Sequence, residues 1–191
     1  MESLLVSTGA IAFAEIGDKT QLLAIILAAH FKRPIPLILG ILFATLINHS
    51  LAAAAGIWLA STINHTTLRW ILAGSFIAMA IWAFVPDKLE ENQPMIKGKM
   101  GVFWVTFFTF FLVEMGDKTQ LATIAFTAHY ATPFMVVMGT TLGMLIADVP
   151  AIMLVSKTTN KLSLKLVRSI SAVFFIFMGI VTLLNVNRFF S

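Results

Sequence analysis

The sequence predicts an all-α integral membrane protein whose six transmembrane helices form two inverted-topology repeats of three helices each. Three observations lead to this fold class. Of the 191 residues, 59% are hydrophobic and only 12% are charged, whereas soluble domains are about one quarter charged. Apolar runs of about twenty residues, long enough to cross a hydrocarbon core of ~30 Å, recur along the chain. One short polar motif occurs twice inside these runs.

Each expected helix is an apolar run that ends at a polar or proline-containing turn. The six runs cover residues 4–29, 34–60, 68–84, 101–128, 133–156 and 166–186. The longest connection, residues 86–100, is charged and contains prolines, so it is expected to be a solvated linker. The chain is therefore expected to be a single domain, residues 1–191, in which the linker joins repeat one (1–85) to repeat two (101–191).

The basic residues predict how the chain is oriented. Two of the 13 Lys and Arg residues lie inside the repeated motif. Nine others fall at the first, third and fifth connections, and only two lie on the opposite side. Cytoplasmic loops carry an excess of Lys and Arg. We therefore expect a multi-pass protein of the cell (inner) membrane with a cytoplasmic linker and both termini outside. This topology, rather than nucleic-acid binding, explains the net charge of +4.

The motif reveals an internal duplication. The stretches AEIGDKTQL and VEMGDKTQL begin 99 residues apart. The same shift, without a gap, also pairs His30 with His129, Pro34 with Pro133, Gly40 with Gly139, Arg69 with Arg168 and Met79 with Met178. Three helices per copy is an odd number, so the second copy enters the membrane from the opposite side. Inverted repeats are common in secondary transporters, which hold their site near the midplane. Plain duplication of a stable hairpin would not need duplicated carboxylates.

Each motif places two carboxylates deep in the membrane. Glu15 lies eleven residues into the first expected helix, a depth of roughly 16 Å at ~1.5 Å per residue. Glu114 is placed similarly from the other surface. Asp18 and Asp117 follow the glutamates at i+3 and share a helix face with them. Packing of the two halves would bring these four carboxylates together.

The other residues of the motif favour a cation site. Gly17 and Gly116 permit a close backbone approach or a break in the helix. Neutral oxygens beside the acids come from secondary candidates, namely Thr20, Gln21, Thr119 and Gln120. A set of oxygen ligands with negative charge suits hard dications such as Mn²⁺, Ca²⁺ or Mg²⁺.

The alternative is a structural pair of salt bridges. Lys19 and Lys118 follow Glu15 and Glu114 at i+4, the preferred order for a helical ion pair, so we expect them to be ion-pair partners. Each motif nevertheless holds two acids and one base. If the lysine pairs with one acid, one negative charge per motif stays unpaired. An unpaired charge at the midplane costs at least ~2.5–3.5 kcal/mol on insertion scales. A bound dication or a proton would relieve it.

A fifth acid, Asp148, lies inside the fifth expected helix two residues before Pro150. It could join the site, relay protons, or cap a kink at the proline. Its repeat partner is His49, which follows Asn48. Both are weaker candidates, because polar side chains in membranes also form hydrogen bonds between helices. The small residues Ala52 and Gly56, and Gly139 with Gly143, are expected to be helix-packing surfaces.

Two copies of E-x-G-D-[KR]-[TS], each opening a three-helix unit, resemble the signature of the manganese/calcium cation–proton antiporter family, which includes Golgi transporters and compact bacterial manganese exporters. The resemblance covers essentially the whole chain. It implies a secondary transporter, not an enzyme, that exports Mn²⁺ or Ca²⁺ in exchange for protons. It also implies metal-binding roles for the four motif acids, Glu15, Asp18, Glu114 and Asp117. No cofactor is expected.

The expected mechanism is alternating access around one cation held between the halves. Protons would compete for the same carboxylates, so an inward proton gradient would drive the metal outward. Three alternatives stay open: a passive cation channel, an exporter of basic amino acids, and an intramembrane enzyme. The enzyme is the weakest, because there is no cysteine and the motifs contain no His. The expected partners are the transported ions and the lipid bilayer. Oligomeric state and the choice between Mn²⁺ and Ca²⁺ are not encoded in residue type.

Overall fold

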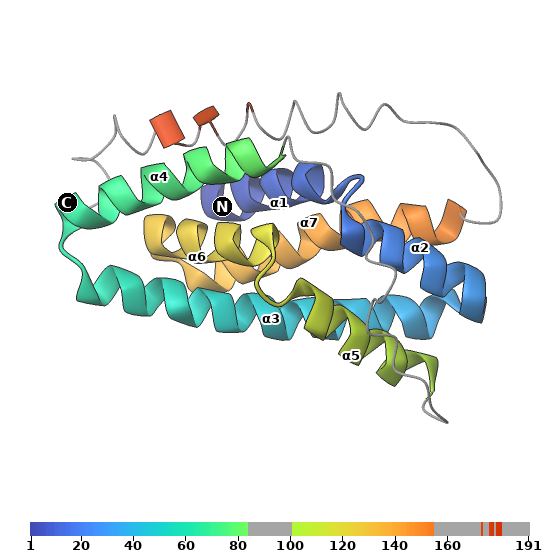
Figure 1. Ribbon diagram of the computed structural model, residues 1–191. Coiled ribbons are helices and arrows are strands. Elements are labelled where there is room, and N and C mark those ends of the chain that lie inside the picture. The colour runs from blue at the N-terminus through green and yellow to red at the C-terminus, as the bar shows by residue number, and fades with distance from the viewer. Residues whose placement is uncertain (84–100, 155–172, 174–175, 178, 181–191) are drawn as a thin grey trace.

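The computed structural model describes residues 1–83 and 101–154, together with 173, 176–177 and 179–180. The elements within these ranges are all helices (Figure 1). They are α1 (Glu2–Glu15), α2 (Lys19–Phe31), α3 (Pro34–Thr62), α4 (His65–Ala83), α5 (Val102–Glu114), α6 (Lys118–Tyr130) and α7 (Pro133–Leu154). The predicted all-α class is therefore confirmed for the described part of the chain.

Three of the expected transmembrane helices are found as single helices. They are α3, α4 and α7, whose bounds differ from the expected ones by a few residues. The first and fourth expected helices, 4–29 and 101–128, are each divided in two at the repeated motif. Predicting them as continuous was therefore wrong, although a local break at Gly17 and Gly116 was one of the two expectations. The sixth, 166–186, lies almost wholly outside the described residues, as does the linker 86–100.

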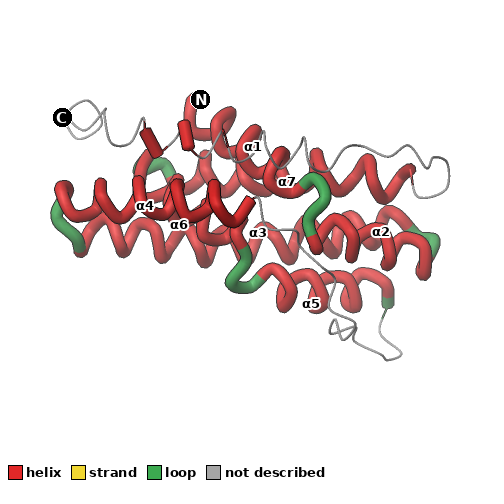
Figure 2. Tube along the Cα trace, turned by 45° about the horizontal axis from the view of Figure 1, so that its top comes forward, coloured by secondary structure: helices red, strands yellow, loops and turns green. Residues whose placement is uncertain are grey.

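The long helix α3 packs against more of the described helices than α1 does. It packs against α5, α6 and α7, while α1 packs chiefly against α7. In Figure 1, α1 and α2 follow one another from left to right, whereas α5 and α6 follow one another from right to left. Figure 2 shows the loops that divide each of these helices. Helix α7 packs against α1 and α2 on either side of the first break, and α3 packs against α5 and α6 on either side of the second. At the second break the turn residues Met115 and Gly116 are exposed, whereas Glu114 and Asp117 beside them are buried.

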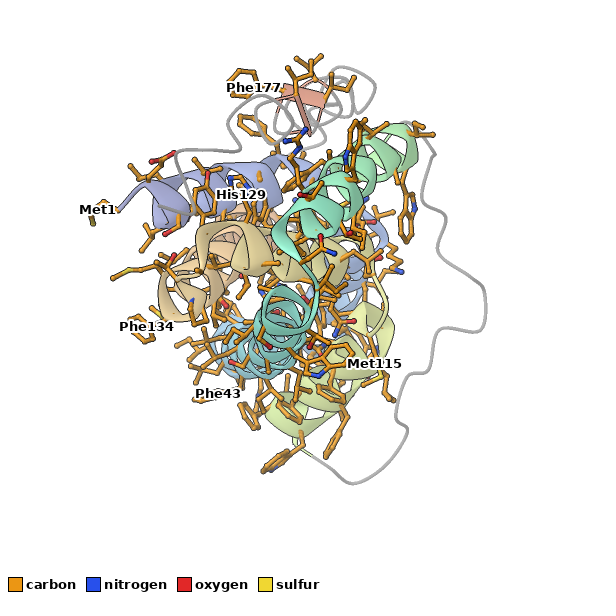
Figure 3. All side chains as sticks on the ribbon, turned by 90° about the vertical axis from the view of Figure 1, so that its left-hand side faces the viewer. Met1, Phe43, Met115, His129, Phe134 and Phe177 are labelled. Carbon is orange, nitrogen blue, oxygen red and sulfur yellow. The ribbon has the colours of Figure 1, made fainter. Side chains whose placement is uncertain are left out.

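The outer surface of the bundle is apolar. Phe43 and Phe134 are 45% and 70% exposed and point away from the helices (Figure 3). The buried set instead contains many polar and charged side chains, including five carboxylates. By length and composition, two described helices could cross a membrane alone, Pro34–Thr62 and Pro133–Met153. An apolar outside around a polar inside is the arrangement expected of a protein dissolved in lipid.

Glycines allow the closest helix contacts, as expected for Gly56, Gly139 and Gly143. A Cβ on Gly56 would lie 2.6 Å from the Ile124 carbonyl oxygen, and one on Gly143 would lie 2.6 Å from that of Thr8. These neighbours are backbone atoms, which cannot move aside as a flexible side chain would. The α3–α6 and α1–α7 contacts therefore depend on the missing side chains.

We expect Gly143→Leu to destabilise the protein by about 2–3 kcal/mol, the usual upper range for overpacking. A 191-residue protein would then unfold about 5 °C or more lower in detergent. The measurement is thermal unfolding followed by circular dichroism. Gly74→Leu is the matched control, because a Cβ at Gly74 in α4 meets nothing within 4 Å. Equal unfolding temperatures for the two variants would contradict the close α1–α7 contact.

Candidate cation site at two broken helices

The helix breaks have the same backbone geometry in both copies of the motif. Ile16 and Met115 have φ/ψ of −63°/116° and −64°/120°, and Gly17 and Gly116 follow with φ of +81° and +79°. The Asp18 amide donates to the Glu15 carbonyl at 3.0 Å. These values describe a type II turn, which requires a positive φ at its third residue and therefore favours glycine there. The motif glycines are explained by this conformation.

A glutamine closes each break. Gln21 Oε1 accepts the Gly17 N–H at 2.8 Å, and Gln120 Oε1 accepts the Gly116 N–H at 2.7 Å. Gln21 also donates from Nε2 to the Ala147 carbonyl at 2.9 Å, which ties the first break to α7. The amide oxygens that the sequence offered as secondary ligands are therefore engaged with backbone donors. In this structure the two glutamines fix the shape of the turns.

The two halves exchange their lysines. Lys19 Nζ lies 2.7 Å from Asp117 Oδ1, and Lys118 Nζ lies 3.0 Å from Asp18 Oδ2. The expectation of ion pairs at i+4 with the glutamates was wrong. Each glutamate ends one helix and each lysine begins the next, so the turn between them removes the helical spacing that the i+4 pair needs. The lysines remain ion-pair partners within the motifs, but they join one motif to the other.

Glu114 is held by two side chains of α3. Thr45 Oγ1 donates to Oε2 at 3.2 Å, and His49 Nε2 lies 3.1 Å from Oε1. Asn48 donates to the Phe111 carbonyl at 3.1 Å, so it makes the interhelical hydrogen bond that was the alternative to a transport role. All three α3 side chains are fully buried. Thr45 was not among the sequence candidates, although its spacing of i, i+4 from His49 places both on one helix face.

Glu15 has a different environment, although it occupies the equivalent position. The repeat partners of Thr45 and His49 are Met144 and Asp148. Within the described part of the chain, neither carboxylate oxygen of Glu15 or of Asp148 has a hydrogen-bond partner, and both residues are fully buried. The break in the first half therefore faces an acid where the break in the second half faces a histidine.

The five buried acids belong to one electrostatic cluster. Glu15 interacts with Asp18, Asp117 and Asp148 as well as with the Lys118 ammonium. Asp148 in turn interacts with Glu114 and Asp18. The structure thus brings together the four motif acids and the fifth acid that the sequence left undecided. The hydroxyls of Thr20 and Thr119 are also fully buried and, among the residues that the structure describes, have no hydrogen-bond partner.

The cluster is not a preformed metal centre. No group of three or more His, Asp and Glu side chains in the described residues is arranged to hold a metal ion. The ammonium groups of Lys19 and Lys118 each contact one aspartate, Asp117 and Asp18 respectively. Coordination of a dication through Asp18 Oδ2 or through Asp117 Oδ1 therefore requires the lysine on that oxygen to move.

The structure contains two broken helices, and buried carboxylates at their breaks lie inside a bundle with an apolar surface. This combination is typical of a membrane transport protein for cations. Comparison with known proteins agrees. The chain matches the family described as "Divalent cation/proton antiporter GDT1" over residues 3–91 and 102–188. It belongs to this family. The expectation of a transporter rather than an enzyme is therefore confirmed, and the family resemblance read from the motif is correct.

The similar curated proteins come from bacteria and plants. A candidate manganese exporter of Vibrio cholerae is 43% identical over 95% of this chain and 90% of its own length. The GDT1-like protein 2, chloroplastic, of Oryza sativa subsp. japonica is 30% identical over 91% of this chain and 58% of its own. The GDT1-like protein 3 of Oryza sativa subsp. indica is 26% identical over 92% and 71%. No solved structure matches the chain.

Proposed function

We propose that the protein exports a divalent metal cation in exchange for protons. Mn²⁺ is the preferred candidate for this cation, and Ca²⁺ is the second. The proposed ligands are the four motif carboxylates, Glu15, Asp18, Glu114 and Asp117. The observation that carries the proposal is the meeting of the two motifs, with Lys19 of one half 2.7 Å from Asp117 of the other. This contact between the two halves supports the proposal, because transporters built from inverted repeats hold their substrate at the junction of the repeats. The candidate manganese exporter among the relatives favours Mn²⁺.

The ligand chemistry supports a hard dication. The buried side chains of the two motifs include four carboxylates and two threonine hydroxyls, and the chain contains no cysteine. Thr20 and Thr119 are the secondary ligands we favour, since their buried hydroxyls lack hydrogen-bond partners among the described residues. The proposed role of Gln21, Gln120 and Asn48 is structural, because their side-chain amides form hydrogen bonds with backbone groups. Asp148 is the proposed proton-pathway residue, because it interacts with acids of both motifs.

Transport follows from rocking of one half against the other. The proposed architecture is six transmembrane helices in two inverted repeats, with the central linker in the cytoplasm and both termini outside. Each half contributes one broken helix, so movement of a half opens or closes the cluster to one side. Protons and the metal compete for the same carboxylates. A proton gradient directed inward therefore drives the metal outward.

The test uses purified protein in vesicles loaded with a Mn²⁺-sensitive dye. We expect saturable Mn²⁺ flux that follows an imposed pH gradient, reverses when the gradient is reversed, and moves protons in the opposite direction. Vesicles without protein provide the control. Flux that does not change when the gradient is collapsed would contradict exchange and favour a channel. Flux of lysine without Mn²⁺ flux would contradict the choice of substrate.

A further inference from the structure

We infer that Lys19 and Lys118 are competing internal cations that set the metal affinity of the site, an inference that rests on the proposed function. Their ammonium groups take the aspartate oxygens that the transported dication needs. The metal binds when these ammonium groups leave, and they return when it is released.

The position of the lysines is unfavourable for the helices. Lys19 and Lys118 are the first residues of α2 and α6. A helix N-terminus carries a partial positive charge, so it stabilises anions and disfavours cations. Burial adds a further cost for an ammonium group, and the Lys118 side chain is only 8% exposed. Helix stability therefore gives no reason for a lysine at either position, and such local conflicts are expected at functional sites.

The contacts place the ammonium groups on the proposed ligands. Asp18 Oδ1 accepts the Lys19 backbone N–H at 2.6 Å, and Asp18 Oδ2 lies 3.0 Å from Lys118 Nζ. Both oxygens of Asp18 are thus engaged. Asp117 Oδ1 is engaged by Lys19 Nζ at 2.7 Å, whereas among the described residues Asp117 Oδ2 accepts no hydrogen bond. A dication that bound Asp18 through Oδ2 and Asp117 through Oδ1 would have to replace one ammonium group on each.

Exchange is geometrically possible because the lysines are long and the Lys19 side chain is partly exposed. The Lys19 side chain is 25% exposed, compared with 1% for Asp117, its partner. An ammonium group on four methylene carbons can leave the carboxylate without movement of the backbone. The two lysines therefore differ from the two glutamines of the motifs, which hold backbone amides and are needed for the turns.

Competition from the lysine ammonium groups would weaken the binding of the dication, which would help the transporter to release it. A transporter must release its ion, and a site of several carboxylates alone binds a dication too firmly for rapid release. If only a fraction of the molecules have the lysines withdrawn, the apparent dissociation constant is raised by the inverse of that fraction. Removing a competing ammonium group should therefore tighten binding and slow turnover.

The experiment measures Mn²⁺ binding to purified protein in nanodiscs, from the loss of the electron paramagnetic resonance signal of free Mn²⁺. We expect Lys118→Met to bind Mn²⁺ about tenfold more tightly than the wild type and to turn over more slowly in vesicles. Methionine has similar length and adds no oxygen ligand. Lys118→Arg, which keeps the charge and binds carboxylates in a bidentate manner, should bind Mn²⁺ no more tightly than the wild type. Lys32→Met, at the exposed end of α2, is the neutral control.

A second measurement needs no variant. Mn²⁺ should increase acetylation of Lys19 and Lys118 by acetic anhydride in the wild-type protein, with Lys32 unchanged, as read by mass spectrometry. Unchanged acetylation together with unchanged Mn²⁺ affinity in Lys19→Met and Lys118→Met would overturn the inference and leave the proposed function intact. A wild-type protein that binds and transports no divalent cation would overturn both.

Discussion

Glu15→Gln is expected to reduce Mn²⁺ transport by about hundredfold or more while leaving the protein at least as stable as the wild type. Loss of a residue that only supports a metal ligand already costs about 10–100-fold, and Glu15 is proposed as a ligand itself. Its carboxylate is fully buried, and in the described structure neither oxygen accepts a hydrogen bond. A neutral amide is less costly to bury than an ionised carboxylate. Activity and stability should therefore move in opposite directions.

The measurements are Mn²⁺ flux in vesicles, thermal unfolding in detergent, and growth on Mn²⁺ of cells whose own gene for this protein is deleted. Glu2→Gln is the matched control, because Glu2 lies at the other, exposed end of α1. Rescue of growth by Glu15→Gln would contradict the proposed site. Glu114→Gln provides a second comparison. It should also lose transport, but it should be less stable than Glu15→Gln, since Thr45 and His49 hold its carboxylate.

The sequence predicts which charged residues come together in this structure, but it does not predict how they pair. The duplication identifies Glu15, Asp18, Glu114 and Asp117 because charged residues in apolar runs are rare and repeat at a fixed spacing. The family match confirms the class of protein that this motif indicated. Local pattern rules then assign each lysine to its own glutamate, because i+4 pairing assumes a continuous helix. In each motif a glycine with positive φ breaks the helix, so the i+4 spacing no longer brings the lysine to its glutamate.

The asymmetry between the halves could also not be predicted from the motifs. They are the same from the glycine to the leucine, yet their glutamates have different neighbours, supplied by helices that are distant in sequence. Thr45 and His49 reach Glu114 from α3 across more than sixty residues. Aligning the repeats does pair His49 with Asp148. Which glutamate each of them approaches depends on how α3 and α7 pack, and no local pattern specifies that contact.

Gly116→Val is expected to lose about hundredfold in transport, because it removes the turn that separates Glu114 from Asp117. Gly116 has φ of +79°, a conformation that costs roughly 1–2 kcal/mol for a residue with a Cβ and more for a β-branched one. The chain can relieve that strain by continuing α5 toward α6. The two acids would then move relative to each other, and a displacement of about 1 Å at a reacting group costs roughly 10²-fold.

The matched variants separate backbone strain from side-chain bulk. A Cβ at Gly116 meets nothing within 4 Å, so the space beside the turn accepts a side chain. Gly116→Asn should therefore keep most of the flux, because asparagine tolerates positive φ better than other residues with a Cβ. Gly74→Val adds the same side chain at another open position, in α4, and should leave flux unchanged. Equal flux in Gly116→Val and Gly116→Asn would show that the conformation of the break does not matter to transport. The site would then depend on the charges alone, not on the broken helices that position them.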